Sequence, residues 1–184
     1  MFAAPAAFFT PLSLLTCPPE LSTIIYLMPV YRKQLSPEQA LQKLKHYCGY
    51  QERCHRDVID KLYSLGVRKS DHGEIIASLI SENYLNEERF AIAFAGGKFR
   101  VNHWGRQKIK YALKQKQVSE YCIKKAIKGI EDQAYLDLLQ KLVREKYLSL
   151  KGEQYLVRKK KTMDYMIQRG FEADLVEKFI SQLS

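Results

Sequence analysis

Proline and glycine are scarce over most of this sequence, and so are the alternating β-branched patterns that mark strands. No proline follows Pro37, and the nine glycines are spread over the 184 residues. A chain with so few turn residues and so little alternation does not match a sandwich or barrel of many short strands. The sequence therefore predicts an all-α protein.

Signatures of catalysis are also missing. There is no nucleophile elbow, no H-E-x-x-H motif and no G-x-x-x-x-G-K-[ST] phosphate loop. Gly96-Gly97-Lys98 lacks the rest of the phosphate-loop pattern, so we interpret it as a helix weakened or kinked by two glycines. We expect no enzyme activity, no catalytic residue and no cofactor.

Paired metal-ligand motifs are absent as well, because the four cysteines form no C-x-x-C pair. His46-x-Cys48 and Cys54-His55 offer four zinc ligands, but their spacing differs from that of structural zinc sites. His46 and Cys48 would also face different sides of a helix. We expect no metal site, and we expect free or buried thiols in a reducing cytosol.

Residues 1–35 lack basic residues before Arg32, whereas a secretory signal begins with a positively charged stretch. Four prolines interrupt the first 20 residues, and no apolar run reaches the ~18 residues of a membrane span. Thr16 before Cys17 is a poor match to a lipoprotein cleavage box. We interpret residues 1–35 as a disordered or mis-called leader, with Met28 as an ordinary start. We expect a cytoplasmic protein that does not bind membranes.

After residue 35, apolar residues recur at helical spacing in segments that form three similar units. Leu62, Leu113 and Met166 occupy matching places, 51 and 53 residues apart. A period near 50 residues with three helices per copy predicts a tandem array, in which stacking of small units supplies much of the stability. We therefore predict an elongated, monomeric array of three tandem three-helix repeats. Their predicted ranges are 36–85, 86–129 and 130–184.

Polar residues predict where several helices begin. Ser36 before Pro37, Asn86 and Ser119 are expected to cap helices. The side chains expected in the core include Ala40, Leu44, Val58, Leu62, Ile75, Leu79, Ile80, Phe90, Ala91, Ala93, Phe94, Ile109, Leu113, Tyr135, Leu139, Val143, Leu156, Met163, Met166, Ile167, Val176 and Ile180.

Acidic residues are few in the central segment from Glu88 to Lys128, which carries eleven basic residues against two acidic ones. Across the whole chain, 30 Lys and Arg against 20 Asp and Glu give a net charge of +10. Lys110 and Lys114 point away from the helical face that Ile109 and Leu113 share. This pattern indicates a surface for a polyanion or for an acidic protein.

A second basic run, Arg158-Lys159-Lys160-Lys161, repeats this arrangement in the third unit. We expect Arg158, Lys161 and Arg169 to point outward, while Lys159 and Lys160 cover the core with their stems. Trp104 is expected either to stack on a base or to pack at a repeat junction. The candidate partner-binding or DNA-binding residues are Arg100, Arg106, Lys108, Lys110, Lys114, Arg158, Lys161 and Arg169.

The stretch from Leu79 to Arg106 resembles the RecX family of bacterial regulators of the RecA recombinase. The match includes Asn83-Tyr84-Leu85-Asn86, then Arg89-Phe90-Ala91, Arg100 and Gly105-Arg106. Asn83 and Asn86 replace the family's usual Gly and Asp, and Gln117 stands where a Lys-Gly turn is usual. Helix ends survive these changes because Asn tolerates the left-handed conformation.

The resemblance implies an elongated, all-helical protein that lies in the groove of the RecA–DNA filament. It implies a regulator that limits the filament's growth and activity in recombination and repair, and it implies no catalytic residue. The alternative is a sequence-nonspecific DNA-binding helical-repeat protein, which rests on charge alone. In both cases single- or double-stranded DNA would contact the basic face.

Overall fold

The structure is a computed structural model that describes residues 35–183. The prediction of a leader therefore falls almost entirely outside the described residues. Within residues 35–183, nine α-helices and one short 3-10 turn account for all the regular secondary structure, without a strand. This confirms the predicted all-α class. An elongated shape stays a prediction.

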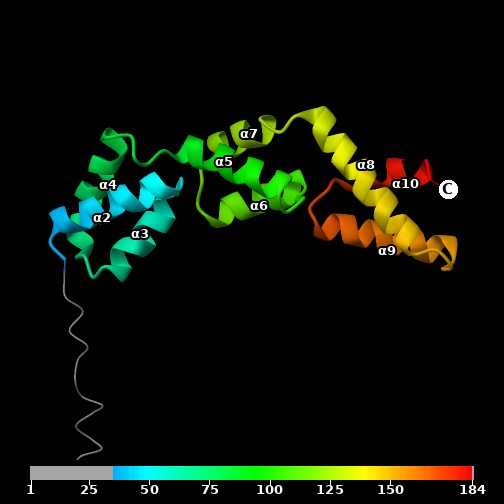
Figure 1. The fold of residues 1–184 in the computed structure, drawn as a ribbon, viewed down its shortest axis with the longest axis horizontal. Coiled ribbons are helices and arrows are strands. Elements are labelled where there is room, and N and C mark those ends of the chain that lie inside the picture. Colours follow the sequence, from blue (N-terminus) through cyan, green and yellow to red (C-terminus); the bar gives the residue numbers. More distant parts are fainter. Residues whose placement is uncertain (1–34, 184) are drawn as a thin grey trace, which may run out of the picture. The chain divides into compact units, whose positions relative to one another are not determined.

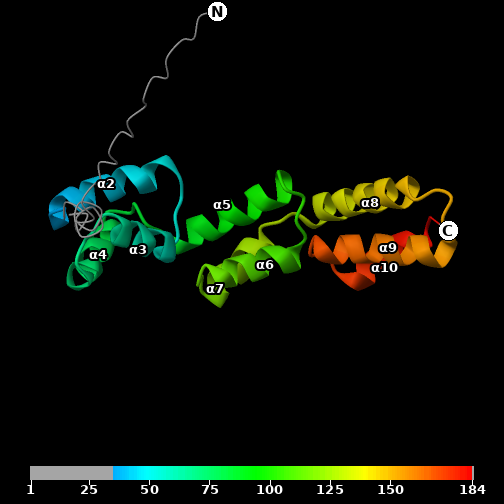
Figure 2. The same ribbon diagram turned by 90° about the horizontal axis from the view of Figure 1, so that it is seen from below.

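The helices form three bundles of three, and within each bundle every helix packs against the other two (Figures 1 and 2). The first bundle contains α2 (Pro37–Tyr50), α3 (His55–Ser64) and α4 (His72–Ser81), with the 3-10 turn η2 (Lys69–Asp71) before α4. The second contains α5 (Glu87–Arg100), α6 (Arg106–Gln115) and α7 (Glu120–Lys128). The third contains α8 (Asp132–Ser149), α9 (Tyr155–Gln168) and α10 (Ala173–Ser181).

Three predicted caps are confirmed. The Ser36 hydroxyl accepts a hydrogen bond from the Gln39 amide at 3.3 Å, and the Asn86 side chain accepts one from the Arg89 amide at 3.0 Å. Ser119 caps α7 in the same way. Each side-chain oxygen satisfies one of the amides that the first turn of a helix leaves unpaired.

One helix begins later than expected. Apolar residues at helical spacing before Gly66 predict a start near Glu52 for the second helix, whereas α3 begins at His55 with Cys54 as its N-cap. The Cys54 sulfur accepts from the Asp57 amide, and the Asp57 carboxylate accepts from the Cys54 amide, both at 3.4 Å. Cysteine is an uncommon cap, so the reciprocal pair was hard to recognise.

Left-handed residues end several helices. Asn83 and Gln117 have φ angles of 61° and 59°, where a glycine is the usual choice. This confirms that the helix ends persist without glycine at these two positions.

Four predicted core residues are exposed: Ile80, Ala93, Leu156 and Ile167. On α9 the buried face is centred on Thr162 and Met166. Leu156 and Ile167 lie about 80–100° around the helix from Met166, and are 74% and 48% exposed. Ala93 lies two residues from each of the buried Ala91 and Ala95, so it faces the opposite side of α5.

The buried residues form two cores. One lies within the first bundle and is built around Leu44, Val58, Leu62 and Leu79. The other runs continuously through the second and third bundles, from Phe90 to Ile180, and also includes Cys54 of the first bundle. The predicted stacking of units is thus apolar between the second and third bundles.

Candidate nucleic-acid and protein interface

A basic groove lies between α6 and α7 and has a volume of about 330 Å³. Ile109 and Leu113 turn one face of α6 into the core, which leaves Lys110 outside. On α7, Ile123 and Ala126 face the core. Lys124 and Lys128, four residues apart, lie together on the exposed face of the same helix. The residues that line this α6–α7 groove are Arg106, Lys110, Ile123, Lys124, Ile127, Lys128 and Asp132.

Three lysines supply the free charge of the groove. Lys110, Lys124 and Lys128 are exposed, and none of them forms an ion pair in the described part of the chain. The pKa of Glu120 at the start of α7 is lowered, first by its hydrogen bond from Lys114 and also by the charges of Lys110 and Lys124. The groove therefore presents a concentrated positive field above an apolar floor of Ile123 and Ile127.

Arg106 closes one end of the groove but is occupied with other parts of the chain. Its guanidinium bonds to the Asp132 carboxylate and to the Ile130 carbonyl, and lies 4.2 Å from the centre of the Tyr135 ring. Its side chain is only 24% exposed. These contacts give this predicted binding residue a clear structural role between the second and third bundles.

Two further candidates are paired within the described residues. Lys114 forms an ion pair with Glu120, and Lys161 forms one with Glu153, each at 2.6 Å. An anionic partner would have to compete with these carboxylates. Lys110, Lys124 and Lys128 form no ion pair of this kind within residues 35–183.

Arg158 does not point outward as expected. Its guanidinium donates to the Tyr147 carbonyl at 3.2 Å and lies 3.9 Å from the centre of the Tyr147 ring. Arg158 precedes the buried Thr162 by four residues, so it extends the packed face of α9. The basic run in the third bundle is thus partly used for packing.

Lys108 and Arg169 lie at the junction of the second and third bundles. The Lys108 ammonium donates to the Gln168 carbonyl at 3.2 Å and lies 4.8 Å from the centre of the Trp104 ring. Arg169 donates to the Asn102 carbonyl at 3.4 Å. Trp104 is half-buried against the shared core, which agrees with packing at a repeat junction.

Arg100 is exposed at the end of α5, and its guanidinium folds back over Gly96. A Cβ atom at Gly96 would lie 3.0 Å from Nη1 of Arg100, so this glycine makes room for the arginine. The helix continues unbroken through Gly96 and Gly97, and the expected weakening has not ended it.

The sequence reasoning missed Lys124 and Lys128 as site residues. Both follow an apolar residue, Ile123 or Ile127, and they lie one helical turn apart. That spacing was visible in the sequence, and so was the helix that corresponds to α6, but the way the two helices pack was not. A groove needs both walls, and only the packing of α6 on α7 shows the second one.

The described helices hold no group of metal ligands and no membrane span. Among residues 35–183, no three His, Cys, Asp or Glu side chains are grouped to hold a metal ion. Cys48 and Cys54 are buried, while His46 is exposed. None of the helices in the same range combines the length and the apolar composition needed to cross a bilayer.

Comparison with known families identifies the three-helix units. The model of the RecX second three-helix domain matches residues 86–127, and that of the RecX third three-helix domain matches residues 133–180. The chain belongs to the RecX family. The two RecX domains follow each other in the expected order and coincide with the second and third bundles.

Relatives called regulatory protein RecX agree with this. The chain is 26% identical to that of Bacillus cytotoxicus over 164 residues, covering 89% of this chain and 58% of the relative. It is 27% identical to that of Lactobacillus johnsonii over 152 residues, covering 83% and 56%. The chain thus spans little more than half the length of these RecX relatives.

Solved structures show the same fold. The crystal structure of RecX from Lactobacillus salivarius superposes with a TM-score of 0.72 at 22% identity, covering 80% of this chain and 96% of that one. A second RecX crystal structure gives a TM-score of 0.71 at 19% identity, covering 78% and 72%.

Proposed function

We propose that this RecX-family chain binds a RecA–DNA filament and limits the recombinase activity of that filament in recombination and repair. The observation that carries the proposal is the α6–α7 groove, which lies within the matched second RecX domain. Its three unpaired lysines suit phosphates or carboxylates, both of which a protein–DNA filament presents.

The apolar floor of the groove supports a contact that includes protein. Ile123 and Ile127 can hold an apolar side chain while the lysines around them attract its acidic neighbours. The proposal assigns binding and no catalysis, and it places the protein in the cytoplasm as a monomer.

Charge reversal in the groove tests the proposal. Lys110→Glu with Lys124→Glu should leave folding nearly unchanged, because both side chains are exposed. We expect this variant to need about tenfold more protein to inhibit ATP hydrolysis by the recombinase on single-stranded DNA, which corresponds to ~1.4 kcal/mol of binding. Inhibition would be measured by titration, and folding by circular dichroism.

A matched control is Lys141→Glu with Lys151→Glu. Both lysines are exposed, and neither forms an ion pair in the described residues, so the change in net charge is the same. We expect the control to inhibit like the wild type. If both variants lost potency equally, overall charge would explain the effect and the groove would have no special role.

The alternative, nonspecific DNA binding, is separated by its dependence on salt. Binding through phosphates alone weakens steeply with rising salt, because the release of DNA counterions gains less entropy when the surrounding salt is more concentrated. We expect a filament contact to persist at salt concentrations that abolish binding to naked DNA. An identical salt slope with and without the recombinase would favour the alternative.

A further inference from the structure

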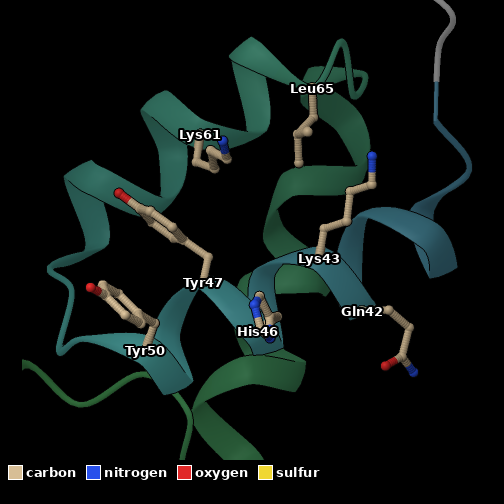
Figure 3. Close-up of a pocket in the computed structure, with 7 residues that line it drawn as sticks. All are labelled: Gln42, Lys43, His46, Tyr47, Tyr50, Lys61 and Leu65. Atoms are coloured by element: carbon tan, nitrogen blue, oxygen red, sulfur yellow. The ribbon is translucent and has the colours of Figure 1, made fainter.

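The first bundle contains a second hollow, between α2 and α3 (Figure 3), with a volume of about 660 Å³. Five of its residues come from α2, one from α3 and one from the turn after α3. They are Gln42, Lys43, His46, Tyr47, Tyr50, Lys61 and Leu65. None of these lining residues is acidic, so within the described residues the hollow is lined by aromatic, cationic and neutral groups only.

Tyrosine rings form one end of this α2–α3 hollow. Tyr47 and Tyr50 lie three residues apart on α2, so they are neighbours on its surface (Figure 3). Tyr50 is 84% exposed, whereas Tyr47 is half-buried. The centre of the Tyr47 ring lies 4.1 Å from the guanidinium carbon of Arg53 and 5.6 Å from the ammonium nitrogen of Lys61. The Tyr50 ring is thus free to stack, and Tyr47 forms a wall fixed by two cations.

Lysines supply the charge. Lys43 lies about two turns before Tyr50, and Lys61 faces the hollow from α3 (Figure 3). Neither of them forms an ion pair in the described part of the chain. Lys43 and Tyr50 are about 10 Å apart along the axis of α2, a length that about three stacked nucleotides span. The negative end of the helix dipole lies at the C-terminal end of α2 and would disfavour a phosphate there. Lys43 is about two turns away from that end.

A neighbouring hollow continues the surface across α2. It has a volume of about 490 Å³ and is lined by Gln42, Lys45, His46, Gly49, Tyr50 and Tyr84. The two hollows share Gln42, His46 and Tyr50. In the second one, Lys45 lies 5.8 Å from the centre of the Tyr84 ring and is paired with Glu82. Each of the two hollows beside Tyr50 is therefore lined by lysine and by a further tyrosine.

We propose that the first bundle binds single-stranded nucleic acid across α2, with a base stacked on Tyr50 and phosphates held by Lys43 and Lys61. Aromatic rings beside a cationic groove are what unpaired bases recognise. A duplex keeps its bases stacked inside and cannot offer one to Tyr50. An acidic peptide would engage the lysines but leave the exposed ring without a partner. The inference concerns a different bundle from the α6–α7 groove and stands without the recombinase.

Fluorescence anisotropy with a labelled 20-residue oligothymidylate, without recombinase, tests this inference. Tyr50→Ala should raise the Kd about tenfold, while Tyr50→Phe keeps the ring and should bind like the wild type. The matched control is Tyr111→Ala on α6, where the tyrosine is 65% exposed and lines neither hollow. We expect this control to change the Kd less than about twofold.

Salt dependence tests the two lysines. Lys43→Ala with Lys61→Ala removes two phosphate contacts, so the slope of log K against log salt should become shallower by about 1.4. The same change at Lys141 and Lys151, which lie outside the hollow, should leave the slope close to that of the wild type.

Three results would overturn the inference. One is an equal loss of binding in Tyr50→Ala and Tyr111→Ala, or no loss in either. Another is binding of a blunt duplex as tight as that of the single strand. The third is displacement of the oligonucleotide by a polyglutamate of equal charge as effective as by unlabelled oligonucleotide. Because the assay contains no recombinase, these failures leave the proposed function untouched.

Discussion

The joint between the first and second bundles and the joint between the second and third are built from different interactions. The former depends mainly on ion pairs and polar contacts, and each bundle has its own core beside it. The latter is a continuous apolar core with backbone hydrogen bonds across it. Units of similar plan in one chain are thus coupled with different strength.

Close backbone contact holds the second and third bundles together. The Gly105 amide donates to the Arg169 carbonyl at 2.8 Å, and the Gln107 amide donates to the Gly170 carbonyl at 3.0 Å. The Arg106 amide also donates across the joint to the Tyr135 hydroxyl at 3.3 Å. Within the third bundle this buried hydroxyl donates to Glu172, and burial followed by that bond raises the pKa of Tyr135. Such contacts leave the two bundles little freedom to separate.

Charged side chains connect the first and second bundles. Arg89 donates to Glu52 at 2.9 Å, and Lys116 donates to Asp57 at 2.9 Å. Burial opposes ionisation of Asp57, but hydrogen bonds from Lys116 and Cys54 and the charge of Lys116 outweigh it and lower the pKa of this carboxyl. Cys54 contributes the buried apolar contact of this joint, since it belongs to the core of the other two bundles. We therefore expect this joint to open first.

The largest effect is expected from Leu113→Asp. Leu113 is fully buried in the core that the second and third bundles share, so an unpaired carboxylate there should destabilise both by more than ~4 kcal/mol. We expect hydrogen exchange to lose protection across α5–α10, while α2–α4 stay protected.

The matched variant is Leu44→Asp, at a fully buried position in the core of the first bundle. It should remove protection from α2–α4 and leave α8–α10 intact. Full protection of the third bundle in Leu113→Asp would show that the two bundles fold independently, and the contrast between the joints would be wrong.

A smaller effect is expected from Gly105→Ala, which acts on the tighter joint alone. The added Cβ would lie 2.2 Å from the Gly170 carbonyl carbon and oxygen and 2.4 Å from the Phe171 nitrogen. Backbone cannot yield as a flexible side chain does, so we expect a loss of about 2–3 kcal/mol in urea unfolding.

Gly49→Ala is the control for this glycine. Nothing lies within 4 Å of a Cβ built there, and the residue is in a helix. Alanine should therefore stabilise the protein by up to ~1 kcal/mol. If Gly105→Ala were as harmless as Gly49→Ala, the close approach of Gly105 to Gly170 would not exist in solution.

Local signals carried most of the fold prediction. Ser36, Asn86 and Ser119 have side chains that cap helices whatever lies around them, and apolar residues such as Leu62 and Leu113 recur at helical spacing. The errors came where the packing of a helix on its neighbours decides which of its faces is buried. Leu156 and Ile167 look like core residues, yet α9 turns Thr162 and Met166 inward.

The candidate site was less predictable for the same reason. The net charge predicted that basic side chains would form the binding surface. It did not predict which of them would be engaged in contacts within the protein itself. Arg106, Lys108, Arg158 and Arg169 engage carbonyls or rings from distant parts of the chain, at separations that no local pattern shows. Lys110 was both predicted and left unpaired, and its neighbours in the groove come from α7.

The smallest effect concerns the polar joint and depends on pH. Lys116→Met removes the ion pair to Asp57 but leaves the hydrogen bonds between Asp57 and Cys54. The pKa of Asp57 is lowered in the folded state, so the pair stabilises the protein above the unfolded pKa near ~3.9 and is lost as pH falls below it. Because both groups are partly exposed, we expect a difference from wild type of only ~0.5–1 kcal/mol at pH 6, which shrinks as the pH falls below ~3.9 toward the lowered pKa of Asp57.

Lys114→Met is the control, because its partner Glu120 lies in the same bundle and is exposed. Urea unfolding of both variants at pH 6 and pH 3 would measure the difference. We expect only the Lys116 variant to increase hydrogen exchange in α3 at pH 6, since of these two ion pairs only Lys116–Asp57 crosses between bundles. A deficit in Lys116→Met that stayed constant down to pH 3 would mean that the lysine acts through its packing on Phe90, whose ring centre lies 5.8 Å from its ammonium, and the polar joint would not depend on charge.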